Sequence, residues 1–329
     1  MNRRDTLAAL VAFCAAGGAP VALAQKQEKM RRIGYLVLSP LTDKPSPERA
    51  AFIEGLRALG YVEGRNLKIE YRSAEMAAEF LPGLAAELVA AGVELIFAVE
   101  SNVVSAALKA TSAIPVVFVS IADPVEMNFA HSLARPGRNA TGITLLGANL
   151  APKVLETLRD LLPAAKRVAV LRGTGGTGMT GEWVALDAAA ARLGFGLELF
   201  PVRNSADFPR QLQRIARAKP DALFVMTDNR TIAARRIIAD FALAQRLPSV
   251  MGFGGYTLAG GLLSLATDFT EQFGRAAAYV DRILKGAKPG ELAIEQPTRF
   301  DLVVNLKTAR AIGIALPQSL LIRADRVIE

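Results

Sequence analysis

The sequence predicts an α/β protein whose chain forms two doubly wound parallel-sheet lobes with a cleft between them, behind a signal peptide. Three observations predict this fold. Ten short apolar runs alternate with helix-like segments between residues 31 and 286, most of the runs are continuously apolar, and the order strand, helix, strand is repeated in the two halves. Continuous apolar strands indicate burial on both faces, as in a parallel sheet covered by helices. A chain of 329 residues, 51% of them hydrophobic, is long enough for two such lobes.

Residues 1–24 have the pattern of an export signal. A basic start with Arg3 and Arg4 precedes an uncharged stretch over residues 6–25, and residues 22–24 form the small–x–small pattern of a cleavage site. Cleavage after Ala24 would deliver the chain to the periplasm through the Sec route or, because of the paired arginines, the twin-arginine route. Cys14, the only cysteine, would leave with the signal.

The ten apolar runs are the predicted strands. They span residues 33–38, 67–71, 93–99, 114–119 and 142–145 in the first half, and residues 168–171, 197–200, 222–226, 249–253 and 262–265 in the second. A break near residues 147–149 separates the two series. Two sheets of about five strands fit the usual size of a sheet better than one sheet of ten.

The charge pattern argues against a nucleic-acid partner. The formal net charge is +8, but the positive residues are scattered along the chain and aromatic residues make up only 6% of it. Nucleic-acid surfaces combine a basic patch or stripe with stacking side chains. A solvated basic surface is the simpler interpretation.

Polar residues follow most of the predicted strands, where ligands bind in open α/β sheets. These loops span residues 39–42, 100–102, 120–124, 172–177, 227–229 and 253–256, with Asp268 after the last strand. Hydroxyl, amide and carboxylate groups there suit a small polar solute. Ser101, Asp123 and Asp228 could equally cap the helices that follow them.

Enzymatic chemistry has little support. The run Gly173–Gly178 matches the dinucleotide fingerprint G-x-G-x-x-G after a strand, and Arg203 after the next strand could face the 2′-phosphate of NADP. A glycine-rich loop at a cleft edge explains the same run. The sequence has one histidine, His131, and no nucleophile elbow, phosphate-binding loop or zinc motif. We therefore expect no enzyme, no metal and no cofactor.

Several segments resemble a family of periplasmic solute-binding proteins of ABC transporters that includes tryptophan- and tyrosine-binding members. They are LARPGRNATG at residues 133–142, YVDRILKGAKP at 279–289, EQPTRF at 295–300, NLKTA at 305–309 and the tail, with Leu-Pro at 316–317 and RADRVIE at 323–329. The resemblance covers residues 31–329 and is most specific in the final sixty. Arg138 departs from the family pattern, which has glycine there, and so does the Gly173–Gly178 loop.

The resemblance implies a type I periplasmic-binding fold whose two lobes close on a solute. Lobe one would span residues 31–146, with residues 270–290 returning to it, and lobe two residues 147–268. Residues 291–329 would form a hinge-crossing strand and a C-terminal tail, which the resemblance assigns to neither lobe. Closure by ligand contacts to both lobes would present the protein, expected to be a monomer, to a membrane permease.

Position by position, the resemblance implies a set of polar ligand-binding residues. Those of lobe one are Ser39, Ser101, Asn102 and Asp123, and those of lobe two are Thr174, Thr227, Asp228, Tyr256 and Asp268. An amino-acid-like solute would need a carboxylate for its ammonium group, and an aromatic one a stacking partner such as Tyr256 or Phe253.

Three functions remain open on the sequence. The favoured one is the solute-binding component of an ABC importer, which binds an amino-acid-like solute without turnover. The alternatives are an NADP-linked oxidoreductase that uses the Gly173–Gly178 loop and a ligand-sensing module of the same fold.

Overall fold

The computed structural model describes residues 29–145, 150–174 and 180–329 of the chain. The predicted signal, the break at residues 147–149 and most of the glycine loop lie outside these ranges. The chain divides into two units, Met1–Met30 and Arg31–Glu329. Everything below concerns the second unit.

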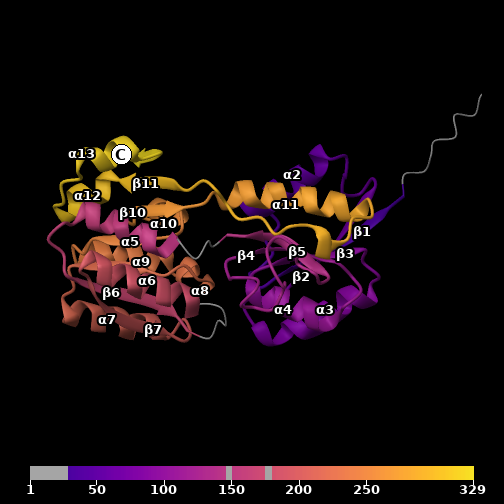
Figure 1. Cartoon of the computed structure of the whole chain (residues 1–329), viewed down its shortest axis with the longest axis horizontal. Coiled ribbons are helices and arrows are strands. Elements are labelled where there is room, and N and C mark those ends of the chain that lie inside the picture. Colours follow the sequence, from indigo (N-terminus) through magenta and orange to yellow (C-terminus); the bar gives the residue numbers. More distant parts are fainter. Residues whose placement is uncertain (1–28, 146–149, 175–179) are drawn as a thin grey trace, which may run out of the picture. The chain divides into compact units, whose positions relative to one another are not determined.

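Lobe one is built on a five-stranded parallel sheet of order β2-β1-β3-β4-β5 (Figure 1). Tyr35 of β1 lies between Tyr71 of β2 and Phe97 of β3 in the register. The strands are β1 (Arg31–Val37), β2 (Leu67–Ser73), β3 (Leu95–Val99), β4 (Val116–Ser120) and β5 (Ala140–Thr144). The helices are α2 (Pro47–Ala58), α3 (Leu81–Ala90), α4 (Ser101–Ala110) and α11 (Phe269–Leu284), with short 3₁₀ turns η1 (Ala78–Phe80) and η2 (Pro289–Glu291).

Helices α2 and α11 lie side by side on one face of this sheet, although 211 residues separate Ala58 from Phe269 (Figure 1). Gly55 permits the close approach, because a Cβ there would lie 2.7 Å from the carbonyl oxygen of Gly274. Between helices and sheet, Phe52 stacks on Phe97 with the ring centres 4.0 Å apart. The return of α11 therefore builds the core of lobe one.

Lobe two is built on a seven-stranded sheet of order β12-β11-β10-β9-β8-β6-β7, parallel except for the antiparallel pair β10–β11. The strands are β6 (Arg167–Gly173), β7 (Gly196–Val202), β8 (Ala222–Val225), β9 (Ser249–Met251), β10 (Leu263–Ala266), β11 (Asp301–Asn305) and β12 (Arg326–Ile328). The helices are α5 (Leu150–Leu161), α6 (Thr180–Leu193), α7 (Asp207–Ala218), α8 (Asn229–Ala233), α9 (Arg235–Ala244), α10 (Gly255–Leu258), α12 (Leu306–Ile312) and α13 (Gln318–Arg323).

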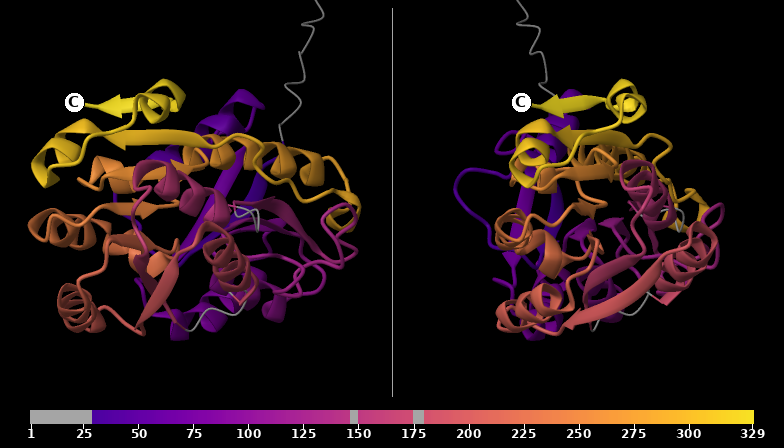
Figure 2. Two further views of the ribbon diagram at one scale, coloured as in Figure 1. Left: turned by 60° about the vertical axis from the view of Figure 1, so that its left-hand side comes forward. Right: turned by 90° about the vertical axis from the view of Figure 1, so that its left-hand side faces the viewer.

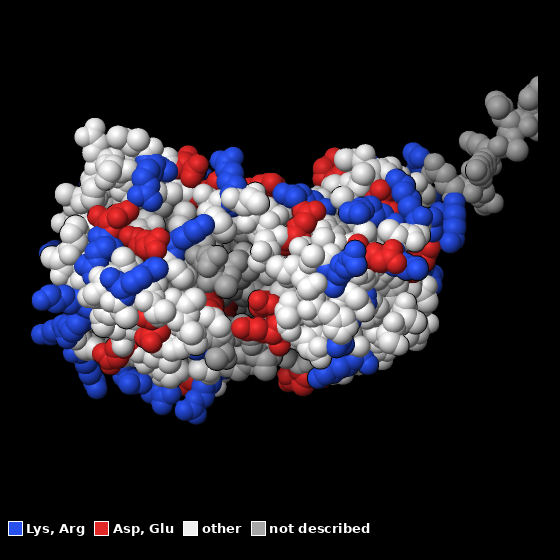
Figure 3. Space-filling view, viewed as in Figure 1, with Lys and Arg blue, Asp and Glu red and all other residues white. Residues whose placement is uncertain are grey.

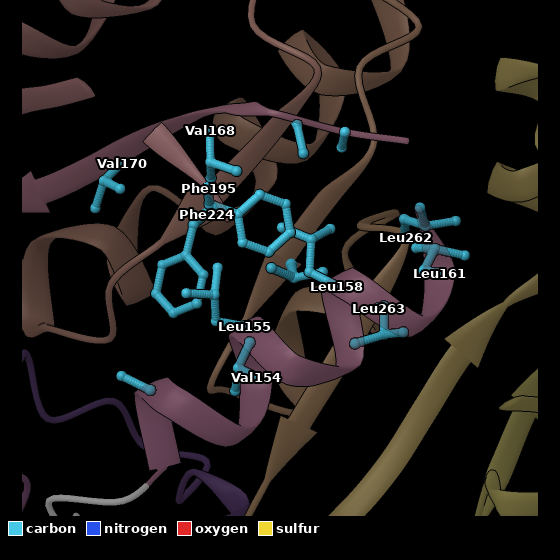
Figure 4. Close-up of a cluster of buried hydrophobic side chains, with 14 of the residues drawn as sticks. Val154, Leu155, Leu158, Leu161, Val168, Val170, Phe195, Phe224, Leu262 and Leu263 are labelled. Carbon is cyan, nitrogen blue, oxygen red and sulfur yellow. The ribbon is translucent and has the colours of Figure 1, made fainter. Parts of the chain in front are cut away.

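A hydrophobic core fills each face of the lobe-two sheet. Figure 4 shows one of them, in which Leu155 and Leu158 of α5 pack beside Phe195 and Phe224. All four side chains are buried. Burial of side chains of this size stabilises the fold by about 1.5–3 kcal/mol each. Strands buried from both sides explain why the sequence shows continuous apolar runs.

The C-terminal tail belongs to the lobe-two sheet (Figures 1 and 2). Strands β11 and β12 extend that sheet, and Leu302, Val304 and Leu320 join the core shown in Figure 4. The chain passes between the lobes after β5, between β10 and α11, and between Glu295 and β11. The prediction of two α/β sheets was correct, and lobe one has the expected five parallel strands. The second sheet has seven strands because the C-terminal segment adds β11 and β12, and it contains one antiparallel pair.

Gly142, in the segment that carries the family resemblance, is required by the pairing of β5 with β4. Its φ is +149°, and a Cβ at this position would lie 2.0 Å from the carbonyl oxygen of Phe118. Backbone atoms of a central strand cannot move away cheaply, so only glycine fits here.

We predict that Gly142→Ala lowers the free energy of unfolding by about 3 kcal/mol or more, because the methyl group clashes with backbone. Gly83→Ala is the control: it lies in α3 with nothing within 4 Å of the added Cβ, so we expect no loss and a gain of up to about 1 kcal/mol. Urea unfolding of both variants measures the effect. Equal stability of Gly142→Ala and the wild-type protein would contradict this account.

Candidate functional site

A cavity of about 290 Å³ opens between the two lobes, at the carboxyl ends of β1, β3 and β4. We call it the interlobe cavity. Lobe one supplies most of its lining, including α11, and lobe two supplies Asn229, Ile232 and Phe253. The lobe-one lining residues are Tyr35, Val37, Ser39, Pro40, Leu41, Thr42, Ser46, Glu48, Arg49, Val99, Glu100, Val119, Ile121, Leu145, Phe269 and Phe273. A site at strand ends and between lobes is where this fold class binds ligands.

Aromatic rings form one side of the cavity. Phe253 of lobe two meets Phe269 of α11 edge-on, with the ring centres 5.2 Å apart. Phe273 lies one helical turn after Phe269 and makes an edge contact with Phe97. Rings from both lobes thus line one side of the cavity, where a flat apolar group can pack against them.

Glu100 connects the two lobes through a hydrogen bond. It follows β3 in lobe one, and its Oε2 accepts a hydrogen bond from Nδ2 of Asn229, the first residue of α8 in lobe two, at 2.9 Å. The residue keeps part of its surface open to the cavity. Protein packed around the carboxyl removes it from bulk water, and this desolvation raises the pKa of Glu100 to about 8.

The backbone of Glu100 is strained. Its φ of +82° and ψ of +149° lie in a region that is nearly restricted to glycine. Such a conformation costs about 1–3 kcal/mol and persists where the surroundings impose it, often at functional sites. The strained backbone conformation therefore lies at the residue whose side chain contacts the opposite lobe.

Arg49 is the one cationic side chain in the lining, all of whose residues are described. Its Nη2 donates to the carbonyl oxygen of Thr42, and its guanidinium lies 5.9 Å from the centre of the Tyr71 ring. Tyr35 lies close enough for Arg49 and Glu100 to influence its pKa, which burial raises strongly. Arg49 can therefore pair with an anionic group of a solute.

Of the four lobe-one residues predicted to bind ligand, Ser39 lines the interlobe cavity. The Ser101 hydroxyl lies 2.8 Å from that of Ser120, and Asn102 lies in the first turn of α4. Asp123 accepts hydrogen bonds from the amides of residues 125 and 126, at 2.7 and 3.2 Å. Asp123 therefore stabilises its own turn.

The five lobe-two residues lie outside the cavity lining. Asp228 accepts from the amides of Gly173, Arg230 and Thr231 and forms a capping box at the start of α8, and Asp268 caps α11 through the amide of Glu271. Tyr256 is wholly buried, and its hydroxyl donates to Ser249 Oγ at 2.7 Å. Thr227 is buried, and the Thr174 amide donates to the carbonyl of Val202. As ligand contacts these residues stay predictions.

Sequence reasoning missed the residues that make the cavity distinctive: Glu100, Asn229, Arg49, Phe269 and Phe273. Glu100 and Asn229 stand in two of the polar loops that the sequence pointed to, directly beside Ser101 and Asp228. Arg49 lies on α2, and Phe269 and Phe273 lie on α11. Helix α11 can line the cavity because the chain returns to lobe one there. The sequence feature that identified these loops was their position directly after a strand. This feature did not distinguish a side chain that caps a helix from one that lines the cavity.

Other kinds of site find little support in the described ranges. Within them, no group of three or more His, Cys, Asp and Glu side chains could hold a metal ion, and no helix is long and apolar enough to cross a membrane. Of the glycine loop, Gly173 and Thr174 are described, and the amide of Gly173 donates to Asp228 at 2.8 Å. Charged side chains of both signs are spread over both lobes on the face in Figure 3.

Residues 43–328 match the family model of ABC transporter substrate binding proteins. The chain belongs to this family. A tyrosine-binding protein from Clostridioides difficile (strain R20291) is 25% identical over 290 residues, which cover 87% of this chain and 82% of that protein. A solved structure of a conserved domain protein from Vibrio cholerae is 27% identical, with a TM-score of 0.85 over 91% of this chain and all of the other.

The fold is shared with a Streptococcus pneumoniae ABC domain solved in complex with L-Trp. That structure is 24% identical and matches with a TM-score of 0.84, over 91% of this chain and all of the other. The type I periplasmic fold is therefore confirmed. The family match supports a substrate-binding function over an oxidoreductase. Members of the family bind a small solute outside the cytoplasm and work with an ABC permease.

We predict that Glu100→Gly is more stable than Glu100→Ala by about 1 kcal/mol, because glycine relieves the positive φ while both variants lose the carboxyl. The same pair at Glu54, exposed in α2, provides the control, and there glycine should be the less stable by about 1 kcal/mol. Chemical denaturation of the four variants tests this. If alanine is also the more stable residue at position 100, the backbone there is not strained.

Proposed function

We propose that this chain captures an amino acid with an aromatic side chain in the interlobe cavity and delivers it, unchanged, to an ABC permease. The observation that carries the proposal is the composition of the cavity: aromatic rings from both lobes beside one arginine and two glutamate side chains. An aromatic amino acid presents the complementary set of a ring, a carboxylate and an ammonium group.

Each part of such a solute has a partner in the lining. The ring fits beside Phe253, Phe269 and Phe273, and the carboxylate can pair with Arg49. The ammonium group requires an anionic partner, for which Glu48 and Glu100 are the two carboxylates of the lining. A volume of about 290 Å³ is at the low end for small-molecule sites, which favours a single amino acid over a larger solute.

The relatives support the same class of ligand. The Clostridioides difficile relative is named for tyrosine binding, and the Streptococcus pneumoniae structure holds L-Trp. Both compounds combine a flat aromatic ring with an amino-acid zwitterion. The chemistry of the cavity and the names of the relatives therefore both indicate an aromatic amino acid as the ligand.

Closure of the lobes would be driven by the solute. We infer that residues 31–146 with 270–290 form one moving body and residues 147–268 the other. Of the C-terminal segment, residues 291–295 stay with lobe one and residues 301–329 follow the lobe-two sheet. The contacts Glu100–Asn229 and Phe253–Phe269 join the two bodies beside the solute site. A ligand that touches both lobes stabilises the closed state by its differential affinity.

We propose that the protein is an exported monomer, released into the periplasm by cleavage after Ala24, with no nucleic-acid partner and no catalytic activity.

A ligand-sensing module of the same fold is the second candidate function. It would bind the same solute but pass the signal to a membrane partner without transport. Uptake of the labelled amino acid, lost when the gene is deleted, distinguishes transport from sensing.

We predict that at least one of L-tryptophan, L-tyrosine and L-phenylalanine binds the mature protein and raises its melting temperature by linkage. Phe253→Ala should weaken that binding about tenfold or more, because the solute loses an aromatic wall. Phe80→Ala removes an exposed phenylalanine of lobe one, 61% accessible and outside the cavity, and should leave the Kd unchanged. Isothermal titration calorimetry measures both. Absence of binding by all three amino acids, with a melting shift by NADP or a sugar instead, would overturn the proposal.

A further inference from the structure

The two carboxylates of the interlobe cavity differ in their surroundings. Glu48 lies in the first turn of α2 and lines a second hollow as well, together with Asp268 and Arg299. Glu100 stands where the lobes meet, and its Oε2 already accepts a hydrogen bond from Asn229 of the opposite lobe. A group bound to Glu100 therefore contacts the junction that closes.

The chain holds Glu100 in this position at a cost. Its backbone φ of +82° is one that only glycine adopts readily. The carboxyl is largely removed from bulk water, and among the described residues no cation is bonded to it. A strained, desolvated carboxyl at the junction of a cavity is poorly explained by stability. Its partner is best sought in the solute.

We propose that Glu100 is the residue that binds the ammonium group of the solute, and that a proton leaves its carboxyl when this happens. This inference rests on the proposed function. In the empty cleft Glu100 is a neutral acid that accepts the Asn229 hydrogen bond. When the ammonium group enters, the carboxyl proton passes to solvent, and the resulting carboxylate pairs with the ammonium group, whose own protons stay in place.

The charged and titratable groups that face the cavity with Glu100 are consistent with loss of its proton on ligand binding. They are Tyr35 from β1, Glu48 and Arg49 from α2, and the neutral amide of Asn229 from α8. Desolvation is the cause that raises the pKa of Glu100 to about 8, so the acid is mostly protonated at neutral pH until a cation arrives. An ammonium group beside it stabilises the charged form and lowers that pKa.

Binding is then coupled to pH. At pH 7 a group with a pKa of about 8 is about 0.9 protonated, so binding should release about 0.9 proton per solute. The Kd should rise about tenfold between pH 7 and pH 6, because a proton must be removed from an acid that is by then almost fully protonated. A solute without an ammonium group gains nothing from the carboxylate and should release no proton.

The test is calorimetry of the mature protein with L-tryptophan and with indole-3-propionate, which keeps the ring and the carboxylate but lacks the amine. Titrations at pH 7 in buffers of different ionisation enthalpy count the protons released. We expect about 0.9 proton with tryptophan and close to zero with indole-3-propionate. This measurement needs only the wild-type protein, so it does not depend on the folding of any variant.

Variants assign the proton to Glu100. Glu100→Gln keeps the size of the side chain and an acceptor for Asn229, so it should fold, abolish proton release and weaken tryptophan binding at least tenfold. It should also reduce the ratio between the Kd of indole-3-propionate and the Kd of tryptophan. Glu87→Gln removes an exposed carboxylate of the same lobe, paired with Arg72, and should change none of these values.

The outcomes separate this inference from the proposed function. Tryptophan binding without proton release, or with full affinity in Glu100→Gln, would overturn the role of Glu100 while the binding function stands. Failure of all three aromatic amino acids to bind would overturn both. Proton release that persists in Glu100→Gln would assign the proton to another group and also contradict the inference.

Discussion

Parallel strand pairing is the constraint on which the rest of the molecule depends. In a parallel sheet every strand ends at the same edge, so the loops after β1, β3 and β4 converge in lobe one, and those after β8 and β9 converge in lobe two. Three passages of the chain between the lobes set these two edges against each other. The interlobe cavity follows from this topology, and the side chains on those loops decide what enters it.

The fold was largely predictable, because burial on both faces leaves a strong pattern in the sequence. The run that became β3 (Leu95–Val99) is apolar throughout, whereas β11 (Asp301–Asn305) begins and ends with a polar residue and lies near the sheet edge. The apolar pattern therefore predicts neither β11 nor β12, and only the family resemblance implies a strand within residues 291–329. Their pairing with β10 is a tertiary contact, which no local periodicity reveals.

The site was predictable only to the level of the loop. Asp228 and Asn229 are neighbours, yet Asp228 caps α8 with its carboxylate while Asn229 reaches across to Glu100. The backbone direction at the helix start decides between these roles, and the residue types do not. The resemblance implied the return of residues 270–290 to lobe one, but it did not single out Phe269 and Phe273, because apolar residues at helical spacing equally predict core packing.

Glu100 lowers the stability of the protein in two ways that serve ligand binding. Strained backbone and a desolvated acid both reduce stability, and the surrounding cores of lobe one compensate for them. In return the protein gains a carboxyl that is neutral when the cleft is empty and becomes charged only beside a cation. Such a group favours amine-bearing solutes over the matching acids that lack the amine.

The most direct test of ligand binding in the interlobe cavity is a crystal structure of the protein, from crystals grown with L-tryptophan at pH 8. The account predicts the indole ring beside Phe253, Phe269 and Phe273, with the ammonium nitrogen about 2.7–3.1 Å from a carboxyl oxygen of Glu100. An indole ring bound elsewhere, for example in the hollow lined by Pro152, Glu156 and Arg192, would contradict it. So would an ammonium group held by another carboxylate with Glu100 free of the ligand.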